Sequence, residues 1–193
     1  MENGFKKFWG NYSSLVVKLI VTQLGCTFFG LLLSFAGEMF FQARGSYFLT
    51  ALVSCFATIF YLYLQFYHTK EQAGKDAIRM DAGRMERDPM GGLKCALLAN
   101  AVNILLAVLA IVGKLFVGNV GFFESYEEGV EYLPKAAVNL AALSDTIAKF
   151  LEAMYLGIIN LLHPYDPLML LWIVFPSLIV VTATYAILTA PKK

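Results

Sequence analysis

The longest uncharged stretch of the chain runs from Tyr47 to His68 and combines two kinds of side chain in a helical pattern. Small or polar residues recur at alternating steps of four and three, which places them on one face of a helix. Large apolar residues, among them Leu52, Phe56 and Ile59, occupy the other faces. Because about 20 residues cross a bilayer as a helix, the pattern predicts a membrane span with its polar stripe toward protein or a wet cavity and its apolar faces toward lipid. The stripe consists of Tyr47, Ala51, Ser54, Thr58, Tyr61, Gln65 and His68.

Three further apolar stretches are long enough to cross a bilayer, so the sequence predicts four membrane-spanning helices in all. They cover residues 15–39, 93–113 and 168–190, beside the span at 47–68. The last of them contains Pro176, which lacks a backbone donor and should kink the helix. Residues 1–14, where aromatic side chains alternate with lysines, are expected to form a brief interfacial helix.

Small and amide side chains in two of these stretches indicate close helix packing. Such residues let helix backbones approach in lipid, where amides also form hydrogen bonds between helices. In the first span we expect Gln23 to make such a bond, and Gly25 and Gly30 to allow close approach. In the third span one face carries Ala96, Ala99, Asn100, Asn103, Ala107 and Ala110.

The segment 69–92 is rich in charge, and its helical pattern continues that of the second span. Opposite charges lie three or four residues apart, which stabilises an exposed helix. The pairs are Glu71 with Lys75, Asp76 with Arg79, and Asp81 with Arg84. We interpret the segment as a solvated extension of the second helix, or a short surface helix, that ends at the turn 88–92.

The pattern of Gly74, Asp76, Gly83, Arg84, Asp88, Gly92 and Leu93, just after a span, resembles one in small, uncharacterised bacterial integral membrane proteins. The resemblance covers about twenty residues. It implies that this loop lies on the inner side of the membrane and carries no implication of activity.

The segment 114–167 contains an acidic, glycine-rich part and then an apolar part at 136–162 whose helical pattern has two interpretations. Asp145, Lys149 and Glu152 fall on one face, and apolar side chains fall elsewhere. We favour an extracytoplasmic amphipathic helix lying on or dipping into the interface. The alternative is a fifth span.

Charge distribution sets the expected orientation. With four spans, the side carrying both termini and the segment 69–92 holds eleven of the 15 basic residues. Positive residues stay in the cytoplasm. The sequence therefore predicts an all-α, polytopic helical bundle in the cell (inner) membrane, with both termini cytoplasmic and 114–167 outside. A fifth span would move Lys192 and Lys193 outside, which also argues against it.

No catalytic motif is present in the sequence, and we expect neither an enzyme nor a cofactor. Cys26, Cys55 and Cys95 lie far apart and are interpreted as apolar packing residues. The acids at 124–131, with His163 and Asp166, have oxygen ligands suited to calcium, but their spacing matches no known loop, so we favour a solvated loop and expect no metal site.

Two functions are open, and we favour the first over the second as its alternative. One is a structural or interaction subunit, either a homo-oligomer or part of a membrane complex, in contact with the lipid bilayer and with no nucleic acid. The other is a small-molecule-binding or transporter component that uses the polar stripe. The residues expected to line such a site are Ser54, Thr58, Tyr61, Gln65, Asn100, Asn103 and Gln23. For these residues we favour a structural interpretation, in which they form hydrogen bonds between helices.

Overall fold

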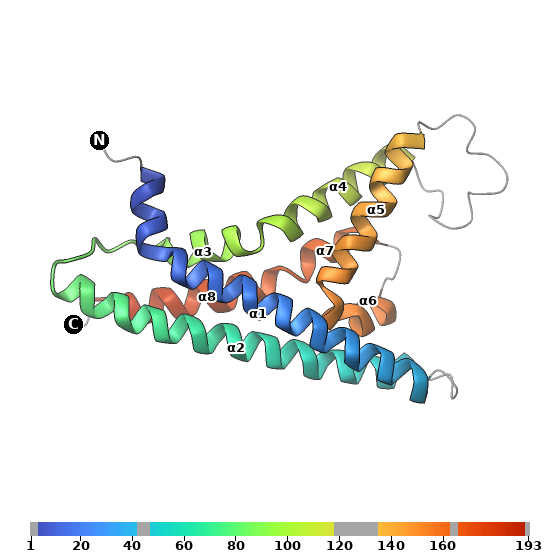
Figure 1. Ribbon diagram of the computed structural model, residues 1–193, viewed down its shortest axis with the longest axis horizontal. Coiled ribbons are helices and arrows are strands. Elements are labelled where there is room, and N and C mark those ends of the chain that lie inside the picture. Colours follow the sequence, from blue (N-terminus) through green and yellow to red (C-terminus); the bar gives the residue numbers. More distant parts are fainter. Residues whose placement is uncertain (1–3, 42–46, 118–134, 163–165, 192–193) are drawn as a thin grey trace. The chain divides into compact units, whose positions relative to one another are not determined.

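The computed structural model describes residues 4–41, 47–117, 135–162 and 166–191, and every regular element in these ranges is helical. The helices are α1 (Gly4–Phe41), α2 (Tyr47–Asp81), α3 (Gly91–Ala99), α4 (Ala101–Val117), α5 (Lys135–Leu151), the 3₁₀ turn η4 (Ala153–Tyr155), α6 (Leu156–Leu162), α7 (Leu168–Trp172) and α8 (Phe175–Thr189) (Figure 1). The all-α class is therefore confirmed. The acidic stretch 118–134 and His163 lie outside the described residues.

Within the described ranges, three helical segments are long and apolar enough to cross a membrane: Phe8–Leu33, Thr50–Asp81 and Leu168–Thr189. The number rises to four if the bent pair Gly91–Ala99 and Ala101–Leu115 is one span. By length and composition, the chain has the helices of a membrane protein.

The helix boundaries differ from the prediction in several places. The N-terminal segment is part of the continuous α1 and does not form a separate interfacial helix. The second helix continues beyond its span but ends at Asp81, before the predicted turn at 88–92, because Gly83 adopts a positive φ of 68° and turns the chain. Asp81 consequently pairs with Arg87 and not with Arg84.

Two predicted spans are interrupted. The stretch 93–113 breaks at Asn100, whose side-chain Nδ2 donates to Ala96 O at 2.9 Å, a local bond that competes with regular helix geometry. The stretch 168–190 breaks at residues 173–174, so that Pro176 lies in the first turn of α8, where its missing N–H costs nothing. This break agrees with the kink that Pro176 predicts.

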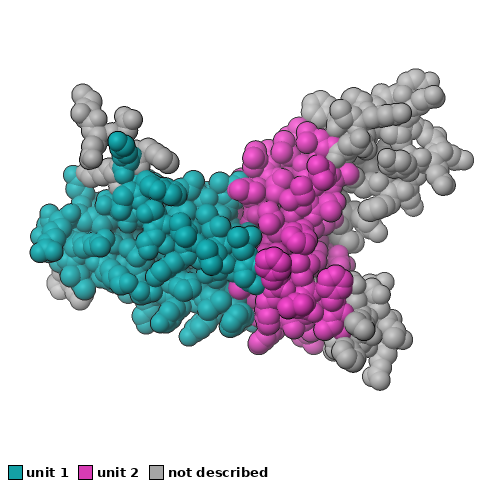
Figure 2. All heavy atoms as spheres, viewed as in Figure 1, with its two compact units in different colours: residues 1–25, 59–101, 175–193 teal, residues 26–58, 102–174 magenta. Residues whose placement is uncertain are grey.

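The chain folds as two compact units, shown in teal and magenta in Figure 2. Unit 1 comprises residues 1–25, 59–101 and 175–193, and unit 2 comprises residues 26–58 and 102–174. The core of unit 1 joins α1, α2, α3 and α8 through Tyr12, Leu15, Val16, Leu19, Ala73, Cys95, Ala96, Ala99, Val181 and Tyr185.

The small face predicted for 93–113 is buried as expected, in both α3 and α4. In unit 1 a Cβ atom at Gly92 would come within 2.6 Å of the Tyr185 Cβ, so this glycine allows α3 to approach α8 closely. The sequence pattern therefore identified the packing face correctly, although it missed the break at Asn100.

Candidate functional site

The polar stripe of α2 faces protein, as its periodicity predicts. Ser54, Tyr61 and Gln65 are buried, whereas Phe56 and Ile59 on other faces are exposed. Exposed apolar side chains on a helix of this length are suited to contact with lipid.

The stripe extends two turns further than the sequence indicated. Thr69, Gln72 and Asp76 continue the four-three-four spacing from Gln65, and all three are buried. Asp76 is 0% exposed. The interpretation of this part of α2 as a solvated extension is therefore wrong for the face that carries Asp76, because α1, α3 and α8 pack around it in the core of unit 1.

The carboxylate of Asp76 is held by side chains from two helices. The Gln72 Nε2 donates to Oδ1 at 3.1 Å, and the Tyr185 hydroxyl of α8 donates to Oδ2 at 3.0 Å. An Arg79 Nη1 atom lies 3.7 Å from Oδ1, on a side chain that is itself mostly exposed. A buried carboxylate needs such donors, because burying an unpaired charge is costly.

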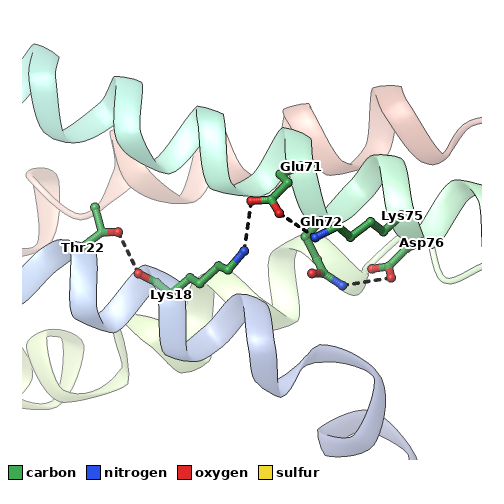
Figure 3. Close-up of polar contacts among 6 residues, drawn as sticks. All are labelled: Lys18, Thr22, Glu71, Gln72, Lys75 and Asp76. Carbon is green, nitrogen blue, oxygen red and sulfur yellow. Dashed lines mark hydrogen bonds and ion pairs between the residues drawn. The ribbon is translucent and has the colours of Figure 1, made fainter.

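The exposed face of the same helix carries a separate set of ion pairs, which Figure 3 shows beside the bond from Gln72 to Asp76. Lys18 Nζ of α1 contacts Glu71 Oε2 at 3.0 Å, and Lys75 contacts the other oxygen of Glu71. The Thr22 hydroxyl donates to the backbone oxygen of Lys18 at 2.7 Å. Exposed pairs of this kind contribute about 0–1 kcal/mol, so we place the functional chemistry on the buried side.

Several buried polar atoms along the stripe have no hydrogen-bond partner within the described residues. They are Gln65 Oε1, Thr69 Oγ1 and His68 Nδ1. The amide nitrogen of Gln65, in contrast, donates to the Tyr61 hydroxyl at 2.6 Å. Buried polar groups are almost always satisfied by protein, water or an ion. These atoms of the stripe could therefore form hydrogen bonds with a bound molecule.

The sequence-predicted site residues are divided between the two units. In unit 1, Tyr61 bonds Gln65 within α2, Asn100 Nδ2 donates to Ser177 Oγ of α8 at 3.2 Å, and Gln23 is buried. Ser54, Thr58 and Asn103 belong to unit 2.

In unit 2 the three predicted residues form hydrogen bonds with the segment between α5 and α6. The Ser54 and Thr58 hydroxyls donate to Met154 O at 2.6 and 3.4 Å, and Asn103 Nδ2 donates to Glu152 Oε1 at 2.5 Å. Glu152 was expected on a polar helix face with Asp145 and Lys149, but α5 ends at Leu151 and the side chain of Glu152 is buried. The expectation assumed one continuous helix through residue 152, and the helix ends before that residue.

Sequence reasoning thus missed Asp76, Tyr185 and Glu152. The four-three-four spacing from Gln65 through Thr69 and Gln72 was a signal that could have identified Asp76. Within the part of the chain that the structure describes, no group of three or more His, Cys, Asp or Glu side chains is placed to hold a metal ion. Cys26 and Cys95 are buried and Cys55 is exposed, each as a free thiol.

Comparison with known proteins assigns the chain to no family. No protein-family model, no curated protein and no solved structure matches the chain.

Proposed function

We propose that this multi-pass helical membrane protein binds a small polar solute through the buried stripe of α2 in unit 1, as a binding or transport component. The observation that carries the proposal is the fully buried Asp76, in line with unpartnered polar atoms of Gln65 and Thr69 on the same helix face. An ionisable group buried on a membrane helix is expensive to retain, and such groups line ligand and ion pathways. The proposal is of a binding protein and not of an enzyme.

The chemistry of the stripe defines the class of solute. Gln65 Oε1 is a pure acceptor, the hydroxyl of Thr69 can accept, and Asp76 contributes a carboxylate. A solute with hydrogen-bond donors complements Gln65 and Thr69, which lie one turn apart, and the carboxylate of Asp76, two turns further along the same face, favours a positively charged solute. We therefore propose a small amine or ammonium-type cation.

A ligand-dependent shift in melting temperature tests the proposal. The detergent-solubilised protein is heated with a panel of small primary amines, and at least one is expected to raise the melting temperature. Gln65→Leu and Thr69→Val should abolish that shift. Thr146→Val, at an exposed position of α5, is the matched control and should keep it. The proposal fails if no amine shifts the wild type, or if both stripe variants shift as much as the wild type.

We further propose that the protein resides in the cell (inner) membrane with four spans, counting α3 and α4 together, and with both termini in the cytoplasm. The excess of basic residues on the side of the termini supports this orientation. Exposed apolar side chains of α5, including Leu143, Ile147 and Phe150, support an amphipathic helix that contacts the outer interface.

A second function, as a homo-oligomer or subunit of a membrane complex, has support from Gly25. This residue is exposed on α1, and a Cβ atom there would meet nothing within 4 Å, so this flank is open to another helix. Particle mass in mild detergent tests it. A uniform monomer that purifies without partners would count against this second function and leaves the solute-binding proposal unaffected.

A further inference from the structure

The helical stretch from α5 to α6 in unit 2 is interrupted at Glu152. Side chains from two other helices donate hydrogen bonds to backbone carbonyl groups at this break. The Thr27 hydroxyl of α1 donates to Leu151 O at 2.6 Å. The Ser54 hydroxyl of α2 donates to Met154 O at 2.6 Å. A helix end leaves carbonyl groups without intrahelical partners, so these hydroxyls satisfy acceptors that the break exposes.

Two glycines let the other helices approach the break closely. A Cβ atom at Gly30 of α1 would lie 2.6 Å from the backbone N and Cα of Met154. A Cβ atom at Gly157 of α6 would collide with the backbone oxygen of Thr50 in α2. The break is therefore enclosed by backbone and hydroxyl groups, in which a charge is poorly solvated.

Glu152 lies inside this enclosure. Its side chain is 3% exposed, and its carboxyl accepts one amide hydrogen bond, from Asn103 Nδ2 of α4 at 2.5 Å. Burial raises the pKa of Glu152 from its usual 4.5 to about 8.

The other charged side chains described in unit 2 contact one another. Lys149 Nζ lies 2.8 Å from Asp145 Oδ2 on α5, and Lys114 Nζ of α4 lies 3.9 Å from Asp166 Oδ1. The buried thiol of Cys26 on α1 and the buried phenol of Tyr155 on η4 are both neutral at pH 7. In the part of unit 2 that the structure describes, the amide of Asn103 is the hydrogen-bond partner of the Glu152 carboxyl, and an amide cannot neutralise a carboxylate.

We propose that Glu152 is a proton-binding site, which holds a proton in the folded protein and couples its release to loosening of the break between α5 and α6. In the protonated form, the carbonyl oxygen accepts the Asn103 bond and the second oxygen carries the proton. Release of that proton to solvent leaves a carboxylate in the enclosure. The break must then admit water or separate from α1 and α2. This proposal does not depend on solute binding in unit 1.

The sign of the pH effect follows from the two pKa values. The unfolded chain releases the Glu152 proton near pH 4.5, whereas the folded chain retains it until about pH 8. The folded state therefore binds more protons between these values, and stability falls as the pH rises through this window.

Infrared spectroscopy of the full-length protein in lipid tests the proposal. At pH 6.5 the wild type should show a carbonyl stretching band of a protonated carboxylic acid that disappears by pH 9.5, and Glu152→Gln should lack this titrating band. Asp145→Asn, which alters an ion pair on α5, should retain it. The proposal is overturned if the wild type shows no such band at pH 6.5, or if the same titrating band persists in Glu152→Gln.

A second variant keeps the test decisive if Glu152→Gln does not fold. Asn103→Leu removes the amide bond that stabilises the carboxylate, so the band should persist to a higher pH than in the wild type. An unchanged titration in Asn103→Leu would show that another carboxyl group is the source of the band. Melting temperature gives an independent readout, because it should fall by several degrees from pH 6 to 9 in the wild type and stay level in Glu152→Gln.

Discussion

The hydroxyl of Tyr185 connects α8 to the buried carboxylate of Asp76 in unit 1. Hydrogen bonds to charged groups are worth about 1.5–3 kcal/mol, more than those between neutral groups. The loss of this donor would leave Asp76 with Gln72 and the mostly exposed Arg79. At the scale of single residues, Tyr185 is thus the main contribution of another helix to the stability of the site.

We expect Tyr185→Phe to lower the free energy of unfolding by about 1.5–3 kcal/mol, because it deletes the hydroxyl and keeps the ring that packs against Tyr12. Thermal unfolding of the purified protein in detergent measures the effect. Tyr63→Phe, at an exposed position of α2, should change stability by less than about 0.5 kcal/mol. Equal stability of Tyr185→Phe and wild type would show that this hydrogen bond contributes nothing.

The hydroxyl of Ser54 satisfies a backbone acceptor at the break between α5 and α6. We expect Ser54→Ala to cost about 1–3 kcal/mol, since it removes the shorter of the two hydroxyl bonds to Met154 O and leaves the weaker bond from Thr58. Thr146→Ala is the control and should stay close to wild type, because the Thr146 hydroxyl is at an exposed position and donates to Ala142 O within α5. Denaturation of both variants at one pH, below 7, keeps the titration of Glu152 out of the comparison.

At the scale of the elements, two glycines of α1 have opposite surroundings. A Cβ atom at Gly30 would meet the backbone of Met154 at 2.6 Å, whereas a Cβ atom at Gly25 would meet nothing within 4 Å. The sequence predicted close approach at both, because spacing alone cannot show which face of a long helix a later segment will cover. The prediction holds for Gly30; at Gly25 no atom of the described residues lies within 4 Å of the Cβ position, so close approach there stays a prediction.

We expect Gly30→Ala to destabilise the protein by about 1–3 kcal/mol through overpacking against a backbone that cannot move aside easily. Gly25→Ala should stabilise it by about 0.5–1 kcal/mol, because alanine favours a helix interior and has room there. Melting temperatures of the two variants at matched detergent concentration provide the comparison. A loss of stability in Gly25→Ala would instead indicate that a second copy or another protein covers that flank.

Helical spacing shows which face of a helix is buried but not which later segment covers it, and this explains which parts of the site were predictable. Periodicity identified the buried faces of α2 and of the stretch 93–113, because burial of a helix face depends on local spacing. The spacing from Gln65 could have extended the buried face to Asp76, but it could not show which side chain bonds the carboxylate, because Tyr185 lies 109 residues later in the chain. Glu152 was misassigned for a related reason: α5 ends one residue before it, and the partner Asn103 is on another helix.

At the scale of the whole molecule, the number of spans decides on which side each loop lies. If the N-terminus is cytoplasmic, as proposed above, and the bent pair α3 and α4 does not cross the membrane, three spans would put Glu128 in the cytoplasm and the C-terminus outside. With four spans the pair crosses, and the two positions exchange sides. The basic residues at 192–193 favour four, because positive residues stay in the cytoplasm.

Reporter fusions distinguish these topologies. Alkaline phosphatase, active only outside the cytoplasm, should be active when fused after Glu128 and inactive when fused after Lys193. A fluorescent protein that matures only in the cytoplasm should give the reverse pattern, and a fusion after Arg84 should be cytoplasmic in both topologies and serves as the control. If the fusion after Glu128 fluoresces and the fusion after Lys193 has phosphatase activity, the bent pair is not a span. The basic tail would then lie outside against the positive-inside tendency, and the amphipathic α5 would have to contact the inner interface.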